Sequence, residues 1–151
     1  MTRYVAEIAA DFDALTTADF DFAPGTSGWE RLAALCDEMR AVNDPVECAP
    51  VMFHTIERLD GVNLGTPGPL VHTLESWRGG YEEVLVQSVR RKPTPLSVWM
   101  VNLILNARPP NAESWRELLR SVADNPAASA VTRAEANRFI TYQKEKGDPL
   151  G

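Results

Sequence analysis

One apolar stretch near the middle of the chain constrains its fold most. Residues 94–106 read TPLSVWMVNLILN, and two consecutive prolines follow at 109–110. Thr94 suits a helix N-cap and Pro95 the first helical position, where the missing N–H costs nothing. The apolar side chains go almost all the way round, which is typical of a helix buried among other helices. A bilayer-spanning helix needs about 20 apolar residues. We therefore expect a central helix of an all-helical protein, with Trp99 and Leu103 both buried in its core.

Apolar residues at helical spacing recur on both sides of this stretch, between capping residues and Gly or Pro breaks. One run covers residues 3–15, and further helix starts are predicted at Ser27, Asp44, Thr66, Gly80, Thr94, Asn111 and Thr132. The pattern predicts a single all-α domain of about eight helices over residues 1–151. Paired starts at 27, 66, 94 and 132 lie 39, 28 and 38 residues apart, near the 40–47 residues of HEAT repeats. A HEAT-like helical stack and a compact orthogonal helical bundle both remain open.

Charge is distributed unevenly along the chain. Residues 1–60 hold 12 Asp/Glu and 4 Lys/Arg, a net charge of −8, whereas residues 61–151 hold 9 and 11, a net charge of +2. Nucleic-acid binding depends largely on Lys and Arg, so the acidic part argues against direct contact with a phosphate backbone. It suits a basic protein partner. Simple solubility is the alternative explanation.

The N-terminus and the cysteines bear on cellular location. The first residues lack the apolar core and small-residue cleavage site of a signal peptide, so we expect a cytoplasmic protein with no membrane partner. Cys36 and Cys48 lie twelve residues apart within apolar helical patterns. This spacing fits neither a disulfide framework nor a zinc site, and it favours two buried free thiols.

Two consecutive predicted helices share a His-Thr-apolar-Glu pattern, at His54–Glu57 and His72–Glu75. In a hairpin with its turn near residue 63, the two carboxylates would lie roughly 7.5 Å apart along the axis. The order is also the reverse of the Glu-x-x-His of carboxylate-bridged metal sites. A repeated structural unit explains the pattern better than a metal site. Nucleophile-elbow, phosphate-loop and zincin patterns are missing, so we expect no enzyme, no metal and no cofactor.

Two segments resemble a known class of proteins. Residues 64–75 (LGTPGPLVHTLE) and 93–106 (PTPLSVWMVNLILN) are similar to small all-helical bacterial immunity proteins of polymorphic-toxin and contact-dependent inhibition systems. The resemblance covers roughly residues 45–140 and consists mostly of turn and core residues. It implies a cytoplasmic, non-catalytic protein that binds and neutralises a toxin domain encoded beside it. No functional residue transfers, because such proteins carry partner specificity in variable surface.

These observations favour an immunity protein that blocks a basic toxin domain, such as a nuclease, through an acidic surface. A HEAT-like scaffold or adaptor protein is the first alternative, and a His/Glu metal-dependent enzyme is the second. The acids expected to meet the partner lie off the apolar stripes, and two phenylalanines are expected to add an exposed apolar anchor. The predicted partner-binding residues are Asp11, Asp13, Asp19, Phe20, Asp21, Phe22, Asp37, Glu38 and Asp60.

Overall fold

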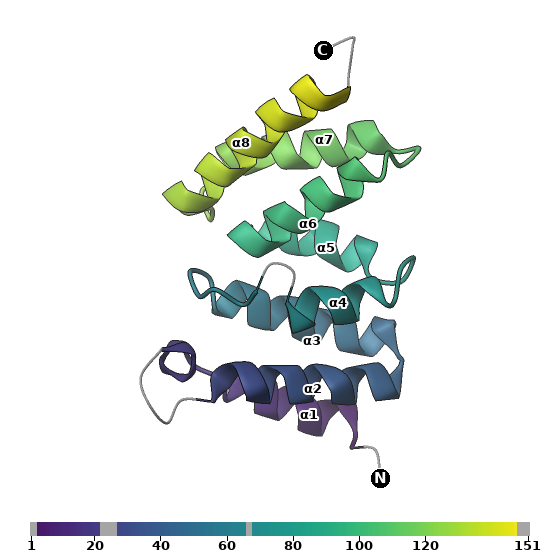
Figure 1. Cartoon of the computed structure of the whole chain (residues 1–151), viewed down its shortest axis with the longest axis vertical. Coiled ribbons are helices and arrows are strands. Elements are labelled where there is room, and N and C mark those ends of the chain that lie inside the picture. The colour runs from purple at the N-terminus through teal and green to yellow at the C-terminus, as the bar shows by residue number, and fades with distance from the viewer. Residues whose placement is uncertain (1–2, 22–26, 66–67, 148–151) are drawn as a thin grey trace. The chain divides into compact units, whose positions relative to one another are not determined.

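The computed structural model of the chain describes residues 3–21, 27–65 and 68–147. Over these ranges it contains eight α-helices, two short 3₁₀ helices and no strand, which confirms the all-α prediction (Figure 1). None of the helices within these ranges is long and apolar enough to cross a membrane.

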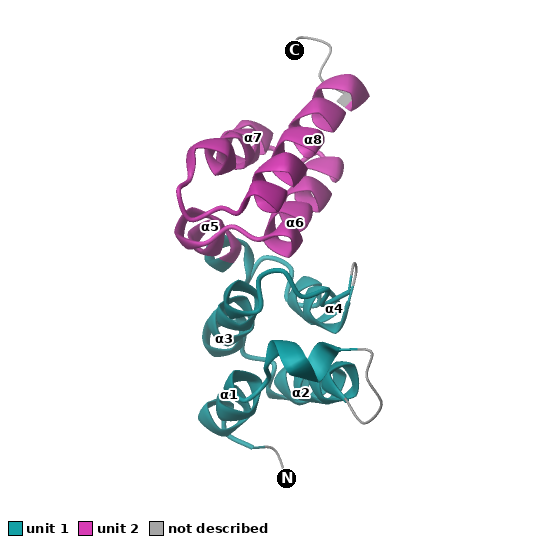
Figure 2. Ribbon diagram, turned by 90° about the vertical axis from the view of Figure 1, so that its left-hand side faces the viewer, with its two compact units in different colours: residues 1–84 teal, residues 85–151 magenta. Residues whose placement is uncertain are grey.

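The chain divides into two compact units, residues 1–84 and 85–151 (Figure 2). The elements of the first unit are α1 (Val5–Asp13), η1 (Thr17–Phe20), α2 (Gly28–Val42), α3 (Pro45–Arg58) and α4 (Pro69–Glu75). Helix α5 (Glu82–Arg91) begins at the end of the first unit and continues into the second. The second unit also holds α6 (Pro95–Asn106), α7 (Ala112–Ser121), η2 (Val122–Asp124) and α8 (Ala130–Gly147).

The first unit is built around α1 and α2. Helix α1 packs against α2 and α3, and α2 packs against α4 and η1. Each helix contributes an apolar face, as the spacing of three and four predicts. The side chains that fill this core are fully or almost fully buried: Ile8, Phe12, Leu15, Leu32, Met39, Met52, Phe53, Ile56, Leu70 and Leu74.

The second unit centres on α6, which packs against both α7 and α8. Asn125, in the turn after η2, ties α5 to this group of helices. Its side-chain amide donates hydrogen bonds to the carbonyls of Val89 and Arg90 over 3.4 and 3.0 Å. Its own carbonyl accepts a hydrogen bond from the guanidinium of Arg133 over 2.8 Å. The turn therefore satisfies carbonyls at the α5 C-terminus, which have no partners within the helix.

Helix α6 starts as predicted. The Thr94 hydroxyl accepts from the Ser97 N–H over 3.2 Å, and the Ser97 hydroxyl accepts from the Thr94 N–H over 3.0 Å. This reciprocal pair is a capping box, with Pro95 at the first helical position.

The prediction that α6 is buried on all sides is wrong. Val98, Met100, Val101 and Leu105 are buried, but Leu96, Trp99 and Leu103 are only half-buried. These three follow the spacing i, i+3, i+7 and so share one side of the helix.

Other predicted helix starts differ in detail. Thr66 lies outside the described residues, and α5 begins at Glu82 where Gly80 was predicted. Ser27 stands at the N-cap of α2 but makes no side-chain capping bond there. Helix α8 begins at Ala130, earlier than the predicted Thr132. The hydroxyl of Ser129 accepts the Thr132 N–H over 3.1 Å and so serves the first turn.

Candidate functional site

The predicted acidic surface lies entirely in the first unit. Asp11 and Asp13 end α1, Asp37 and Glu38 lie on α2, and Asp60 follows α3. Asp19 and Phe20 end η1, and Asp21 comes directly after it. Phe22 falls outside the described residues. The structure thus places the eight described residues of this prediction on one unit, and several of them make contacts within the chain.

Asp11 and Glu38 share one arginine. Arg3 donates two hydrogen bonds to the Glu38 carboxylate, over 2.9 and 2.8 Å, and lies 2.7 Å from Asp11. The bidentate hydrogen bonds from Arg3 lower the pKa of Glu38. These contacts hold the segment before α1 against α2. The three side chains together keep a net charge of −1.

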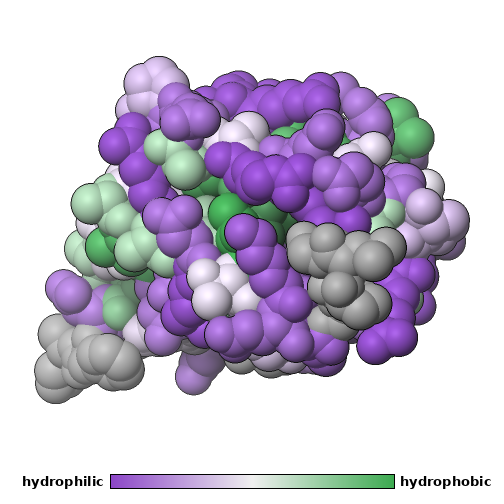
Figure 3. Space-filling model, turned by 90° about the horizontal axis from the view of Figure 1, so that it is seen from above, coloured by the Kyte–Doolittle hydropathy of each residue, from purple (hydrophilic) through white to green (hydrophobic). Residues whose placement is uncertain are grey.

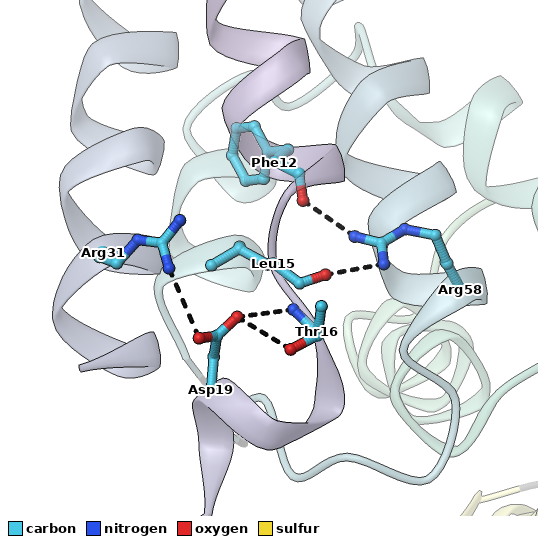
Figure 4. A network of polar contacts seen from close by, with 6 residues as sticks. All are labelled: Phe12, Leu15, Thr16, Asp19, Arg31 and Arg58. Atoms are coloured by element: carbon cyan, nitrogen blue, oxygen red, sulfur yellow. Dashed lines mark hydrogen bonds and ion pairs between the residues drawn. The ribbon is translucent and has the colours of Figure 1, made fainter. Parts of the chain in front are cut away.

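Asp19 has a structural role at the start of η1. Its carboxylate accepts hydrogen bonds from the Thr16 N–H and hydroxyl, over 2.7 and 3.2 Å (Figure 4). The backbone hydrogen bond from Thr16 is the main cause that lowers the pKa of Asp19. Nη1 of Arg31, on α2, lies 3.5 Å from the other carboxylate oxygen of Asp19. A Cβ on Gly28 would lie 2.3 Å from the Asp19 carbonyl oxygen, so η1 sits directly against the start of α2.

A second arginine fixes the same corner from α3. Arg58 donates hydrogen bonds to the carbonyls of Phe12 and Leu15, over 2.9 and 2.7 Å (Figure 4). The Phe12 carbonyl lies in the last turn of α1 and the Leu15 carbonyl just after the helix, where intrahelical donors run out. Asp19 and Arg58 therefore stabilise the turn that joins α1 to η1.

The prediction that Phe20 is an exposed anchor is wrong. Its side chain is 6% exposed and packs edge-on against Trp29, with ring centroids 5.4 Å apart and an interplanar angle of 88°. This T-shaped arrangement is a favoured one for two aromatic rings. Phe20 is therefore part of the core between η1 and α2, and a partner cannot reach it without opening the fold.

The remaining acids are more exposed. Asp13 has a side-chain exposure of 58% and lies 3.8 Å from Nε2 of His54. Asp37 is 66% exposed and pairs with Arg40 one turn along α2. Asp21 is exposed and Asp60 half-buried, and both have partners within the chain. Their role in partner binding stays a prediction.

The His-Thr-apolar-Glu repeat has a structural explanation. Thr55 and Thr73 are buried at 0% and 1% exposure, whereas His54 and His72 are both exposed. The repeat therefore marks the same inward-facing positions on α3 and α4. Among the described residues, no three side chains of the metal-binding types come together as a possible metal site.

The second unit carries a groove that the sequence analysis missed. One hollow, of about 140 Å³, lies between α7 and α8, with Leu119 and Ile140 on its floor and Arg116, Arg120 and Lys144 at its rim. A second hollow, of about 250 Å³, adds Arg108 and Lys146. Arg116 and Gln143 line both, so the hollows adjoin. We call the two together the cationic groove.

Figure 3 is seen from the side of α7 and α8, and it shows apolar atoms recessed between hydrophilic ones. Helical spacing explains this arrangement. Arg116 and Arg120 are one turn apart on α7, and Gln143 and Lys144 follow Ile140 by one turn on α8. Each helix thus presents polar tips beside an apolar position.

Two contacts organise the cationic groove. The Glu113 carboxylate accepts hydrogen bonds from Arg116 over 2.9 Å and from Arg120 over 2.6 Å. The Gln143 amide donates to the side-chain oxygens of Asn102 and Asn106, over 2.6 and 2.9 Å. These asparagines fix the Gln143 side chain at the junction of the two hollows.

No continuous stretch of sequence indicates the cationic groove, because its five cations are spread over residues 108–146. The available signal is a pair of cations one turn apart on α7, Arg116 and Arg120, and an apolar residue, Ile140, one turn before Lys144 on α8. Comparison with known proteins adds no assignment: no protein-family profile, no curated protein and no solved structure matches this chain.

Proposed function

We propose that this chain is a non-enzymatic protein-binding module whose partner is a cationic protein domain, as the toxin of an immunity protein would be. The charge of the first unit carries the proposal. Residues 1–84 hold 15 Asp/Glu and 5 Lys/Arg, a net charge of −10. A field of this sign attracts a basic partner over distances comparable with the Debye length and speeds its association. The similarity of residues 64–75 and 93–106 to immunity proteins supports a toxin as that partner.

The internal contacts refine which acids act on the partner. Asp19 stabilises η1, and Asp11 and Glu38 share Arg3. Asp13 and Asp37 keep more than half of their side chains exposed. In this proposal the exposed acids steer the partner, and the apolar contact comes from residues other than Phe20.

Association kinetics test the proposal. The chain is co-expressed with the product of the adjacent gene, and the two proteins are purified. The rate at which they associate is then measured at low and at physiological salt. Asp13→Lys with Asp37→Lys should lower the association rate at low salt by about tenfold and flatten its salt dependence. Dissociation should change little, because steering acts before contact. Glu117→Lys with Asp124→Lys, at two exposed acids of the second unit, changes the net charge equally and is the matched control, which should leave association unchanged.

Each part of the proposal has its own contrary result. Failure of the adjacent gene product to bind, with no rescue of growth when both are expressed, would rule out the immunity function. If the association rate falls equally in the first-unit variant and in Glu117→Lys with Asp124→Lys, the immunity function stands but the acidic surface has no specific part in it.

A further inference from the structure

The cationic groove is a second surface, of opposite charge to the first unit. Five of its lining residues are Arg or Lys, and Glu113 is the acid that lines it. Residues 85–151 as a whole hold 10 Lys/Arg and 6 Asp/Glu, a net charge of +4. Charge complementarity therefore favours an anionic occupant.

The groove already holds a carboxylate. Glu113 lies between Arg116 and Arg120, which contact its two oxygens over 2.9 and 2.6 Å. The pKa of Glu113 is lowered, chiefly by the hydrogen bond from Arg120. The two guanidiniums are thus spaced to hold one carboxylate between them, each by a charge-assisted hydrogen bond.

The floor distinguishes a peptide from a nucleic acid. Leu119 and Ile140 offer an apolar seat, which suits an aliphatic side chain. Single-stranded nucleic acid depends on aromatic side chains for base stacking. Among the described residues that line the two hollows, none has an aromatic side chain. Gln143, held by Asn102 and Asn106, stands at the junction as a fixed polar group.

We infer that the cationic groove binds an acidic peptide segment of a partner protein, seating an aliphatic side chain on Leu119 and Ile140 while flanking carboxylates meet Arg116, Arg120 and Lys144. Glu113 occupies the two arginines in the free protein and competes with the incoming carboxylate. This site is separate from the acidic surface of the proposed function and takes a ligand of opposite charge.

The test uses the full chain and a short fluorescein-labelled peptide of alternating acidic and leucine residues. Fluorescence anisotropy measures its dissociation constant at physiological salt. Arg116→Gln with Arg120→Gln should weaken binding by roughly tenfold, as two partly exposed charge contacts would. Ile140→Ser should weaken binding by a similar factor, and a peptide with serine in place of leucine should lose the same amount.

Two variants separate the site from general charge and from folding defects. Arg138→Gln removes a cation from α8 that is likewise paired with an acid one turn away, Glu135, and does not line the groove. It should leave binding unchanged. Glu113→Gln frees the two arginines and should tighten binding by severalfold, a gain that a misfolded variant cannot produce.

Four results would overturn the inference. The first is no saturable binding of the acidic peptide. The second is equal loss of binding in Arg138→Gln, which indicates unspecific attraction. The third is tighter binding of a single-stranded oligonucleotide than of the peptide, lost in the same groove variants. The fourth is concentration-dependent self-association in sedimentation that the groove variants abolish, which makes a second copy the occupant.

Discussion

Two acids of the first unit, Asp19 and Glu38, are held in their charged forms by specific donors. The Thr16 N–H lowers the pKa of Asp19, and Arg3 lowers the pKa of Glu38. A group whose pKa is lowered by folding adds stability above its ordinary pKa and loses it as the pH falls through the folded value. The free energy of unfolding should therefore fall as the pH drops below about 5 and passes through the lowered pKa values of these two carboxyl groups.

Replacing both acids, as Asp19→Asn with Glu38→Gln, should make this fall shallower, because the variant has two fewer carboxylates to protonate. Urea unfolding at a series of pH values measures the effect. Parallel curves for the variant and the natural chain would show that neither acid is linked to folding.

The two cysteines should be chemically inert in the folded protein. Cys36 and Cys48 are free thiols with 1% and 0% exposure. Burial raises the pKa of Cys36 to about 12 and also raises the pKa of Cys48. The thiolate is the reactive form of cysteine, so a disulfide reagent should modify both thiols slowly in the native chain. In denaturant it should modify both of them rapidly. Rapid modification of one thiol under native conditions would contradict this burial.

The burial of Phe20 could not be predicted from the residues next to it in the sequence. Its neighbours Asp19 and Asp21 are acids, which predicts an exposed loop. In the structure Asp19 turns back to Thr16, and this turn directs Phe20 onto Trp29. The deciding contact joins two aromatic rings nine residues apart. Local polarity does not encode such a contact.

At the scale of helices, the start of α6 gives a sharp prediction. Thr94 and Ser97 are buried, at 2% and 0% exposure, and exchange hydrogen bonds. Thr94→Ala should lower the free energy of unfolding by about 1 kcal/mol, the usual value of an N-cap side chain. Ser27→Ala, at the α2 N-cap where no side-chain capping bond forms, should cost much less. If both substitutions lower the free energy of unfolding in denaturant equally, the capping box of α6 contributes nothing beyond local helix propensity.

The sequence predicts which segments form helices, but it does not predict which helices pack against one another. Caps, prolines and apolar spacing predicted α6 and its start at Pro95. The same apolar composition predicted that Trp99 and Leu103 are buried, whereas both are half-buried. Composition reports how much apolar surface a helix has, and packing decides which side is covered. The cationic groove was missed for the same reason, since it exists only once α7 and α8 lie together.

The whole molecule separates charge between its two units. The first has a net charge of −10 and the second of +4. A division at residue 60, natural from the sequence alone, gives −8 and +2 and so understates the contrast. The structural boundary assigns Glu75, Glu82 and Glu83 to the acidic unit. Binding of a basic domain and binding of an acidic segment are therefore tasks for different units of one chain.

Each unit also has its own core, and this predicts unequal responses to a core mutation. Leu32 is fully buried in the first unit, so Leu32→Ala should cost about 3 kcal/mol there. Trp29 and Trp77 report on the first unit, and Trp99 and Trp115 on the second. Chains that keep one pair, with the other replaced by Phe, give fluorescence from one unit alone. Leu32→Ala should lower the urea midpoint of the first-unit signal more than that of the second, because the packing it removes belongs to the first core. Equal shifts in both backgrounds would show that the two units unfold as one cooperative block.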